Sequence, residues 1–322
     1  MLLTEDLFAQ FNKALDQELH DIIGEDLPIL AKIKTYVMES GGKRVRPQLL
    51  LLFASHFGVY DANAVALAAI TEIIHAASLL HDDVIDNAQD RRGKPAGRIL
   101  FGNRQVILAG DYLLACGIWR LNRFENQRLM DVFTRVIKEL AVAELLQMEY
   151  EQNPQITPEI YYRIIYGKTA ILFEAATLSA GIYAGQVNLD ALEKIGRDIG
   201  FLFQIRDDIL DYFGAHLLNK TPFQDYENGL FTYPVIELLN RAEEKTRQEL
   251  LHFMTLPWEK RKDKRVQREF LLFLERHQIK EISIYKIESL YQSILQELKN
   301  FQEDEYIRLI KAQLAKLCQL AI

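Results

Sequence analysis

The sequence predicts an all-α fold in a single domain that spans residues 1–322. Only eight prolines and sixteen glycines interrupt the chain, and the long stretches between them place apolar side chains three and four residues apart, the spacing of an amphipathic helix. Alternating strand patterns and hairpin signals are missing, apart from Asn228-Gly229 in a context unlike a strand. Because no Pro-, Ser- or Gly-rich linker divides the chain, we expect one domain rather than several.

The helical spacing is clearest in two stretches. Residues 62–86 repeat apolar side chains at three- and four-residue steps, as at Ile70, Ile73 and Ala77, and residues 195–213 do the same. An irregular loop is expected at about 214–233. Further helices are expected over 104–124, 128–151, 158–184 and 233–252, and over most of 266–322.

The composition excludes several functional classes. The net charge is −7, so the protein as a whole is not expected to bind nucleic acid, and a site for a polyanion has to be a local basic cluster. Cys116 and Cys318 lie far apart, which indicates reduced cytoplasmic thiols rather than a metal site. The N-terminus lacks the pattern of a signal peptide, and no uncharged apolar run reaches the roughly 18 residues that span a bilayer. We therefore expect a cytoplasmic protein that does not span a membrane.

An acidic motif, Asp-Asp-x-x-Asp, occurs twice, at 82–86 and at 207–211. On a helix, the first and last aspartates of each motif share a face, where like charges repel. Each motif also lies in an apolar stretch, where desolvating carboxylates is costly, so a cation is expected between them. Magnesium, which binds carboxylates together with substrate phosphates, suits these ligands. A single motif could equally be an acidic helix end facing solvent; the second copy favours the metal site.

Basic residues suited to a diphosphate occur near both motifs. Residues 41–47 (Gly-Gly-Lys-Arg-Val-Arg-Pro) combine glycines, which let the backbone approach a ligand, with cations that bind phosphate. Arg91-Arg92 follow the first motif closely, and Lys168 interrupts an apolar helix, where a lysine needs an anionic partner. His75 lies two helical turns before the first motif. The simpler explanations are a solvated basic patch at 41–47 and a satisfied core histidine at His75.

In their order, these motifs resemble those of the trans-isoprenyl diphosphate synthase family, the polyprenyl synthetases. The resemblance covers roughly residues 38–236. It rests on Gly-Gly-Lys-Arg-x-Arg-Pro at 41–47, His-x-x-Ser-Leu-Leu-His-Asp-Asp-Val-Ile-Asp at 75–86, Arg-Arg-Gly at 91–93, Gly-Asp-Tyr-Leu-Leu at 110–114, Glu-x-x-Gln at 144–147, Lys-Thr-Ala at 168–170 and Phe-Gln-Ile-Arg-Asp-Asp-Ile-Leu-Asp at 203–211.

The resemblance implies a bundle of mostly antiparallel helices around a deep central cavity, in a homodimer or in a heteromer with a second subunit. It implies condensation of an allylic diphosphate with isopentenyl diphosphate into a linear polyprenyl diphosphate, and peripheral membrane contact for product release. Three magnesium ions with the allylic diphosphate would be bound by Asp82, Asp86 and Asp207, supported by Asp83 and Asp211, with Asp208 also in the catalytic set. The allylic diphosphate would contact Arg91, Lys168, Gln204 and Lys220. The diphosphate of isopentenyl diphosphate would contact Lys43, Arg46, His75 and Arg92. The departing diphosphate would take the proton, helped by Thr169 and Gln204.

The residues before the first acidic motif bear on the chain length of the product. In the resembled family, large aromatic side chains four or five residues before this motif stop elongation early. Here these positions are Ser78 and Ala77, and Ile74 lies one turn further back. We therefore expect a product longer than farnesyl, C20 or, preferably, C30–C50. The alternative is that small residues merely pack helices and that a ring such as Phe124, Trp119 or Tyr150 forms the floor.

The loop after the second motif departs from the family pattern. Asn219 and Phe223 stand where glycines are expected, and Leu230 stands where a lysine is expected. These changes support a rival hypothesis, a weakly active or non-catalytic isoprenoid-binding subunit. A terpene cyclase is a second rival, but 207–215 lack the second metal motif of that class. A structural helical bundle without a ligand is a third.

Overall fold

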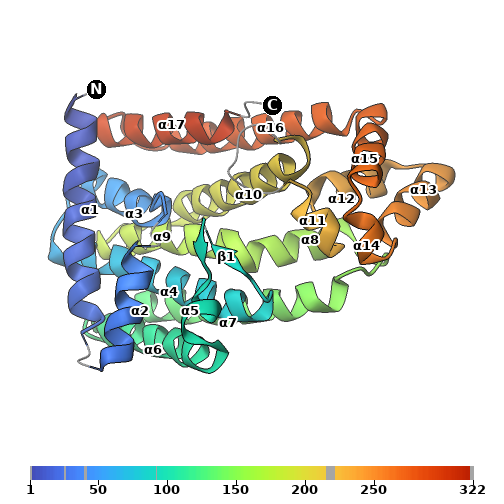
Figure 1. The fold of residues 1–322 in the computed structure, drawn as a ribbon. Helices are drawn as coiled ribbons and strands as arrows, with labels where there is room; N and C mark the ends of the chain where they lie inside the picture. The colour runs from blue at the N-terminus through green and yellow to red at the C-terminus, as the bar shows by residue number, and fades with distance from the viewer. Residues whose placement is uncertain (1, 25–26, 40–41, 92, 215–221, 320–322) are drawn as a thin grey trace. The chain divides into compact units, whose positions relative to one another are not determined.

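The computed structural model describes residues 2–24, 27–39, 42–91, 93–214 and 222–319, and most of them lie in helices (Figure 1). The all-α prediction is confirmed. The strands among the described residues are the short antiparallel pair β1 (Asp90–Arg91) and β2 (Lys94–Pro95). The helices are α1 (Leu2–Ile22), α2 (Pro28–Glu39), α3 (Val45–His56), α4 (Ala62–Ile85), α5 (Gly97–Phe101), α6 (Asn103–Asn122), α7 (Gln127–Tyr150), α8 (Pro158–Ile165), the π-helix η1 (Tyr166–Ala170), α9 (Ile171–Tyr183), α10 (Asp190–Phe213), α11 (Gln224–Asn228), α12 (Tyr233–Arg241), α13 (Glu244–Met254), α14 (Trp258–Arg261), α15 (Lys264–Arg276), α16 (Ile279–Leu298) and α17 (Glu305–Cys318).

Two predicted helices are broken in the structure. The stretch 158–184 is divided into α8, η1 and α9, because five residues adopt π-helical hydrogen bonding. The stretch 233–252 is divided at Ala242, whose extended backbone ends α12. The stretch 266–322, predicted to be mostly helical, contains most of α15 and all of α16 and α17. The remaining predicted helices match the observed ones closely, since their apolar spacing is uninterrupted.

The chain forms two compact units. Unit 1 contains 1–138, 172–196 and 300–310, and unit 2 contains 139–171, 197–299 and 311–322. The helices α7, α10 and α17 contribute residues to both. The prediction of one domain over 1–322 stays a prediction.

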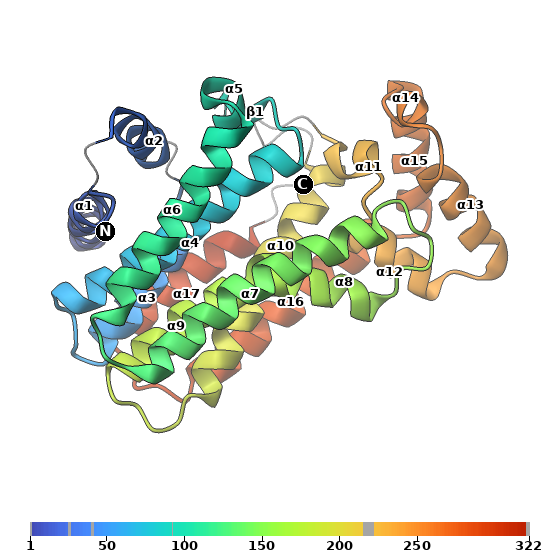
Figure 2. The same ribbon diagram turned by 90° about the horizontal axis from the view of Figure 1, so that it is seen from below.

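In unit 1, α4 is the central helix and packs against α1, α3 and α6 (Figure 2). It begins at Asp61, whose carboxylate accepts hydrogen bonds from the N–H groups of Asn63 and Ala64 at 2.9 Å, a favourable N-cap. Among the described residues, α4 alone is long and apolar enough to cross a membrane by length and composition, and 67% of its most apolar window is buried. A core helix passes the same test, and Glu72 interrupts the apolar run.

In unit 2, α12 packs against α8 and α16, and α15 packs against α16. A cluster of rings joins α11 to this core: Tyr226 stacks on Phe270 with ring centroids 4.4 Å apart, and Tyr212 lies edge-on to both Phe223 and Phe270. Such pairs are worth about 1 kcal/mol each beyond area burial. The cluster therefore fixes the segment that follows the second acidic motif.

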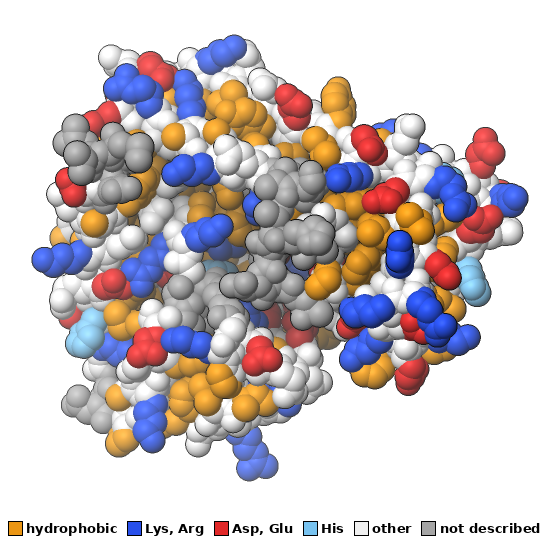
Figure 3. All heavy atoms as spheres, turned by 45° about the horizontal axis from the view of Figure 1, so that its top comes forward, with side chains coloured by type: hydrophobic (Ala, Val, Ile, Leu, Met, Phe, Trp, Pro, Cys, Tyr) orange, Lys and Arg blue, Asp and Glu red, His pale blue; other side chains and the backbone are white. Residues whose placement is uncertain are grey.

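The surface carries both signs of charge. On the face shown in Figure 3, Lys and Arg side chains alternate with Asp and Glu side chains and with apolar patches. Several large apolar side chains of α6 are exposed, including Leu108 (68%) and Trp119 (60%).

Candidate active site

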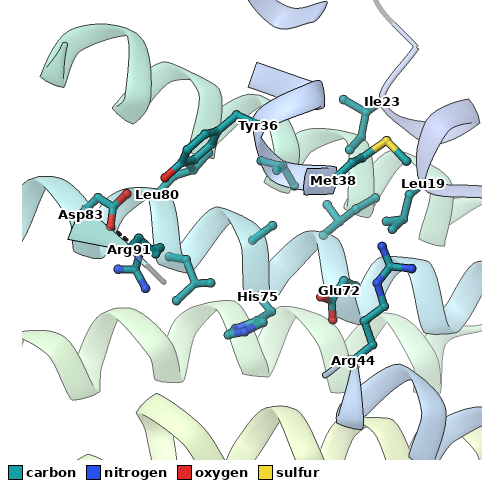
Figure 4. A pocket seen from close by; sticks show the side chains of 14 residues that line it. Leu19, Ile23, Tyr36, Met38, Arg44, Glu72, His75, Leu80, Asp83 and Arg91 are labelled. Atoms are coloured by element: carbon teal, nitrogen blue, oxygen red, sulfur yellow. Dashed lines mark hydrogen bonds and ion pairs between the residues drawn. The ribbon is translucent and has the colours of Figure 1, made fainter. Parts of the chain in front are cut away.

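The first acidic motif lies at the C-terminal end of α4 and divides into two kinds of carboxylate. Asp83 is fully buried: Oδ1 accepts a hydrogen bond from Arg91 Nε at 2.5 Å, and Oδ2 accepts one from the N–H of Gly97 at 2.9 Å (Figure 4). Asp82 is half-buried and Asp86 is exposed. Any support that Asp83 gives to a metal site therefore passes through Arg91 and Gly97, because both of its oxygens are already bonded within the protein.

Arg91 is held at the start of a tight β-hairpin. In the β1–β2 ladder its backbone lies opposite that of Lys94. Gly93, in the turn between them, has φ +77°, a conformation that glycine adopts without strain. The side chain of Arg91 is 23% exposed and lines a pocket, so its guanidinium is positioned for a ligand as well as for Asp83. Arg92 and Lys220, two predicted phosphate ligands, lie outside the described residues.

A pocket of about 40 Å³ lies in unit 1 between α1, α2, α4 and β1. In Figure 4, Asp83 and Arg91 lie on one side of it, Glu72 and Arg44 on the other, and His75 between them. The predicted ligand His75 therefore borders the same pocket as Arg91. The rest of the lining is mostly apolar, with Leu19, Ile23, Val37, Met38, Leu79 and Leu80.

The basic residues of 41–47 have different environments. Lys43 is exposed. Arg44 is bound to Asp16 of α1 at 2.5 Å and serves helix packing. Arg46 is half-buried, with its guanidinium 4.5 Å from the centroid of the Phe173 ring, a cation–π contact that orients it.

The second acidic motif, in α10, also has a buried second aspartate. Asp208 is buried and accepts hydrogen bonds from Tyr161 Oη at 2.6 Å, Gln204 Nε2 at 2.8 Å and the N–H of Tyr233 at 3.0 Å. Burial raises the pKa of Asp208 to about 6, although these three donors oppose the shift. Asp207 remains half-buried.

Asp211 is held by the segment that follows α10. Its carboxylate accepts hydrogen bonds from the N–H groups of Gln224 at 3.0 Å and Asp225 at 3.1 Å, and its carbonyl accepts one from Phe223 at 3.0 Å. Phe223, which replaces an expected glycine, has φ +66° and is buried against Tyr212. A phenylalanine in this left-handed conformation costs about 1–2 kcal/mol, which its ring contacts offset.

Two predicted ligands on the π-helix η1, Lys168 and Thr169, contact different helices. Lys168 Nζ is 2.8 Å from Glu144 Oε2 and donates to Gln147 Oε1 at 2.9 Å, so Glu144 is the anionic partner that its half-buried position requires. An ammonium has three donors, which leaves one for a phosphate. Thr169 Oγ1 donates to Gln204 Oε1 at 2.7 Å and joins η1 to the Asp208 network. π-Helical turns are frequent at functional sites.

The predicted chain-length residues lie in the packed part of α4. Ile74 and Ala77 are fully buried, and Ser78 donates a hydrogen bond to the carbonyl of His75 at 2.9 Å. Among the alternative floor residues, Trp119 is exposed and stacks on Arg123, and Phe124 packs edge-on against Tyr183. On this chain, Trp119 is therefore a surface residue rather than the floor of a cavity.

Sequence reasoning missed two groups that hold the second motif. Tyr161 has no distinguishing sequence signal beyond its place one turn before η1. The N–H of Tyr233 lies within Thr-x-Pro, a part of the family pattern that survives here, and this pattern could have indicated it. Both bind Asp208 rather than a substrate.

The chemistry of the accessible carboxylates fits magnesium. Across the ranges that the structure describes, no three Asp, Glu, His or Cys side chains converge as a complete protein-only metal site. Magnesium seldom requires one, since it binds one or two carboxylates together with substrate phosphates and water. Asp82 and Asp86 at the end of α4, and Asp207 on α10, offer carboxylates of this kind, whereas both oxygens of Asp211 accept main-chain N–H groups.

Comparison with curated proteins gives prenyl diphosphate synthases, several of them named for long-chain products. The chain is 34% identical over 241 residues to the octaprenyl diphosphate synthase of Escherichia coli, covering 74% of each chain. It is 37% identical over 238 residues to the geranyl-diphosphate-specific all-trans-nonaprenyl-diphosphate synthase of Rhodobacter capsulatus, covering 73% of each. It is also 34% identical over 245 residues to heptaprenyl diphosphate synthase component 2 of Bacillus subtilis, covering 75% of this chain and 70% of that one.

Solved structures agree with this fold. A decaprenyl diphosphate synthase from Rhodobacter capsulatus superposes with a TM-score of 0.89 at 28% identity, covering 98% of this chain and 97% of that one. A polyprenyl synthase from Caulobacter crescentus, solved with calcium and isoprenyl diphosphate, has a TM-score of 0.83 at 26% identity, covering 98% and 95%. The sequence profile of the polyprenyl synthetases matches residues 27–271, which include both acidic motifs and the helices that carry them. This chain is therefore a member of the polyprenyl synthetase family.

Proposed function

We propose that this chain is a magnesium-dependent trans-prenyltransferase that condenses an allylic diphosphate with isopentenyl diphosphate into a linear polyprenyl diphosphate longer than farnesyl. The observation that carries the proposal is the shared design of the two acidic motifs. In each motif the second aspartate is buried and bonded within the protein, and the first aspartate is half-buried. A purely structural acidic cluster would not require the same arrangement of buried and half-buried aspartates in two motifs.

Two separate sets of residues are proposed to bind the two diphosphates. Asp82, Asp86 and Asp207 hold magnesium with the allylic diphosphate; Arg91 and Lys168 donate to the same diphosphate. Magnesium, when bound, stabilises the negative charge that develops on the leaving diphosphate. Lys43, Arg46, His75 and Arg92 bind the diphosphate of isopentenyl diphosphate, and Lys220 is a further contact of the allylic diphosphate.

The chain supplies orientation rather than a nucleophile. The allylic C–O bond breaks, the double bond of isopentenyl diphosphate attacks the allylic carbon, and the departing diphosphate takes the released proton. Gln204 has one N–H that Asp208 does not use, and Thr169 keeps acceptor lone pairs after donating to Gln204. These two groups orient the diphosphate and the proton that it receives.

A product of C30–C50 is consistent with the small side chains at Ala77 and Ser78 and with the names of several relatives. The precursors are soluble, which suits an enzyme in the cytoplasm. The long apolar tail of the product suits peripheral contact with a membrane when the product is released.

One assay tests the proposal: the purified chain receives farnesyl diphosphate, isopentenyl diphosphate and magnesium, and the dephosphorylated products are separated by chromatography. Linear prenols longer than farnesol are expected, and none without magnesium.

The rival hypothesis of a non-catalytic subunit makes a different prediction in the same assay. The name of the Bacillus subtilis relative indicates a synthase with more than one component. No product from the chain alone, followed by product after addition of a second subunit, would replace the proposal with this rival.

We further propose a homodimer in which the exposed apolar side chains of α6, among them Leu108 and Trp119, are covered by the second copy. Light scattering should give twice the chain mass of 37.3 kDa. A mass of 37.3 kDa at micromolar concentration would exclude the homodimer.

A further inference from the structure

Arg261, at the end of α14, is a buried cation outside all of the recognised motifs. It is 1% exposed, yet its bonds are made to main-chain carbonyls. Nε donates to the carbonyl of Glu227 at 3.1 Å, and Nη1 donates to the carbonyls of Met254 at 3.2 Å and Leu256 at 2.7 Å. Burying a guanidinium is costly unless its donors are satisfied, so these bonds require Glu227 of α11 to stay in place beside the segment between α13 and α14.

The same junction is reinforced by a second buried polar side chain. Gln267 Nε2 donates to Glu227 Oε1 at 2.8 Å and to the carbonyl of Arg261 at 2.9 Å. At Gly229, where φ is +75°, an added Cβ would lie 2.5 Å from Gln152 Cγ and 3.1 Å from Arg261 Nη2. The chain is therefore enclosed on two sides immediately after α11.

The other end of α11 holds a carboxylate of the second acidic motif. The N–H groups of Gln224 and Asp225, the first two residues of α11, donate to Asp211, and Glu227 is the fourth residue of the same five-residue helix. Because α11 is so short, displacement of the Glu227 carbonyl displaces these two N–H groups. The left-handed Phe223 that begins the segment adds strain, which makes an external restraint more important.

We propose that Arg261 is a positioning residue for the second acidic motif: it clamps α11 and thereby fixes the Asp211 carboxylate in the orientation used at the metal site. The clamp is a property of unit 2 alone, and its effect on catalysis rests on the proposed function. Residues that orient metal-binding carboxylates typically change metal affinity or activity by about 10–100-fold when they are removed.

The first test measures the clamp without any activity. Arg261→Met keeps the length of the side chain and removes the donors, and Arg265→Met is the matched control, because Arg265 is 89% exposed and pairs with the nearby Asp263. Hydrogen–deuterium exchange of 222–230 should be about tenfold faster in Arg261→Met and unchanged in Arg265→Met. Equal exchange in the two variants would overturn the proposal.

The second test separates positioning from a general loss of stability. In Arg261→Met, the magnesium concentration for half-maximal rate should rise about tenfold, and the KM for isopentenyl diphosphate should stay within twofold. A lower rate at every magnesium concentration, with an unchanged half-maximal concentration, would indicate a merely structural role and overturn the proposal.

A third variant covers the case in which Arg261→Met does not fold. Arg261→Lys keeps the charge but replaces the planar fork of donors with a compact ammonium, so it should give an intermediate rise in both exchange and magnesium requirement. Wild-type behaviour of Arg261→Lys in both measurements would overturn the clamp. If the wild-type chain forms no prenyl product, the proposed function fails, and the exchange comparison still decides the clamp.

Discussion

At the level of single residues, the aspartates within each acidic motif have different roles. Asp83 and Asp208 bind neighbouring segments, whereas Asp82 and Asp86 remain accessible. The repeat itself predicts a metal site, but it does not tell which carboxylate faces inward. That depends on partners distant in sequence, such as Tyr161 for Asp208.

Replacing Asp83 should affect folding, and replacing Asp82 should affect chemistry. Asp83→Asn leaves Arg91 without its buried anionic partner, so the free energy of unfolding should fall by about 3 kcal/mol. Asp82→Asn should lower that energy by less than about 0.5 kcal/mol and abolish magnesium-dependent product formation. Urea denaturation and the product assay measure the two quantities. Equal stability of the two variants would show that Asp83 is not an anchor.

Ala77 tests the predicted path of the growing prenyl tail. It is fully buried in α4, and Ala77→Phe should shorten the product, at a cost in stability of about 1–3 kcal/mol for overpacking. Chromatography of the dephosphorylated products gives the chain length. Val187→Phe, at a 96% exposed position, is the control and should leave the product unchanged. An unaltered product from Ala77→Phe would refute the path.

At the level of elements, apolar spacing predicts most helices. Glycines allow the close approach of neighbouring helices at particular points. The π-helix η1 lies inside a stretch whose spacing predicts one continuous helix, because a single extra residue in a turn hardly changes the apolar pattern. Its neighbours are set by two glycines: a Cβ at Gly167 would lie 2.6 Å from the Glu139 carbonyl, and one at Gly200 would overlap the Ala170 backbone. These approaches place Lys168 against α7 and Thr169 against α10.

Alanine at Gly200 should therefore separate α10 from η1. We expect Gly200→Ala to lower the free energy of unfolding by about 3 kcal/mol and to reduce activity, since Gln204 lies one turn further along α10. Gly117→Ala on α6 is the matched control: its Cβ would meet Ile73 at 3.5 Å, an ordinary contact, and alanine favours a helix by about 1 kcal/mol. Similar melting temperatures for both variants would contradict the close contact.

At the level of the whole molecule, contacts between distant segments could not be predicted from the sequence. In unit 1, His56 Nδ1 at the end of α3 donates to Asp304 Oδ2 at 2.7 Å, although the two residues are 248 positions apart. Asp304 also accepts a hydrogen bond from the N–H of Ile307 at the start of α17. Local spacing identifies both helices but contains no information on this pairing.

This pairing should make the free energy of unfolding depend on pH in the acidic range. Partial burial would raise the pKa of Asp304, but the N–H of Ile307 and the His56 ring outweigh it and lower the pKa. The ionised carboxylate therefore stabilises the folded state above its unfolded pKa of about 4, and this contribution is lost as pH falls through the lower folded pKa. At pH 7, Asp304→Asn should be up to about 1 kcal/mol less stable than wild type, since the pair is partly exposed. Urea denaturation from pH 7 to pH 4 and below should show the difference shrinking; a constant difference would exclude the linkage.

The bonds of Arg261 to three carbonyls also limit how far the protein can be shortened. The motifs that identify the family end near residue 236, so a truncated chain ending there would retain every recognisable catalytic residue. Such a minimal fragment would lack the guanidinium that holds Glu227, 34 positions earlier. It would also lack Gln267 and the Phe270 ring beneath Tyr226. A deletion series should therefore lose the ordered second motif well before it removes any part of that motif.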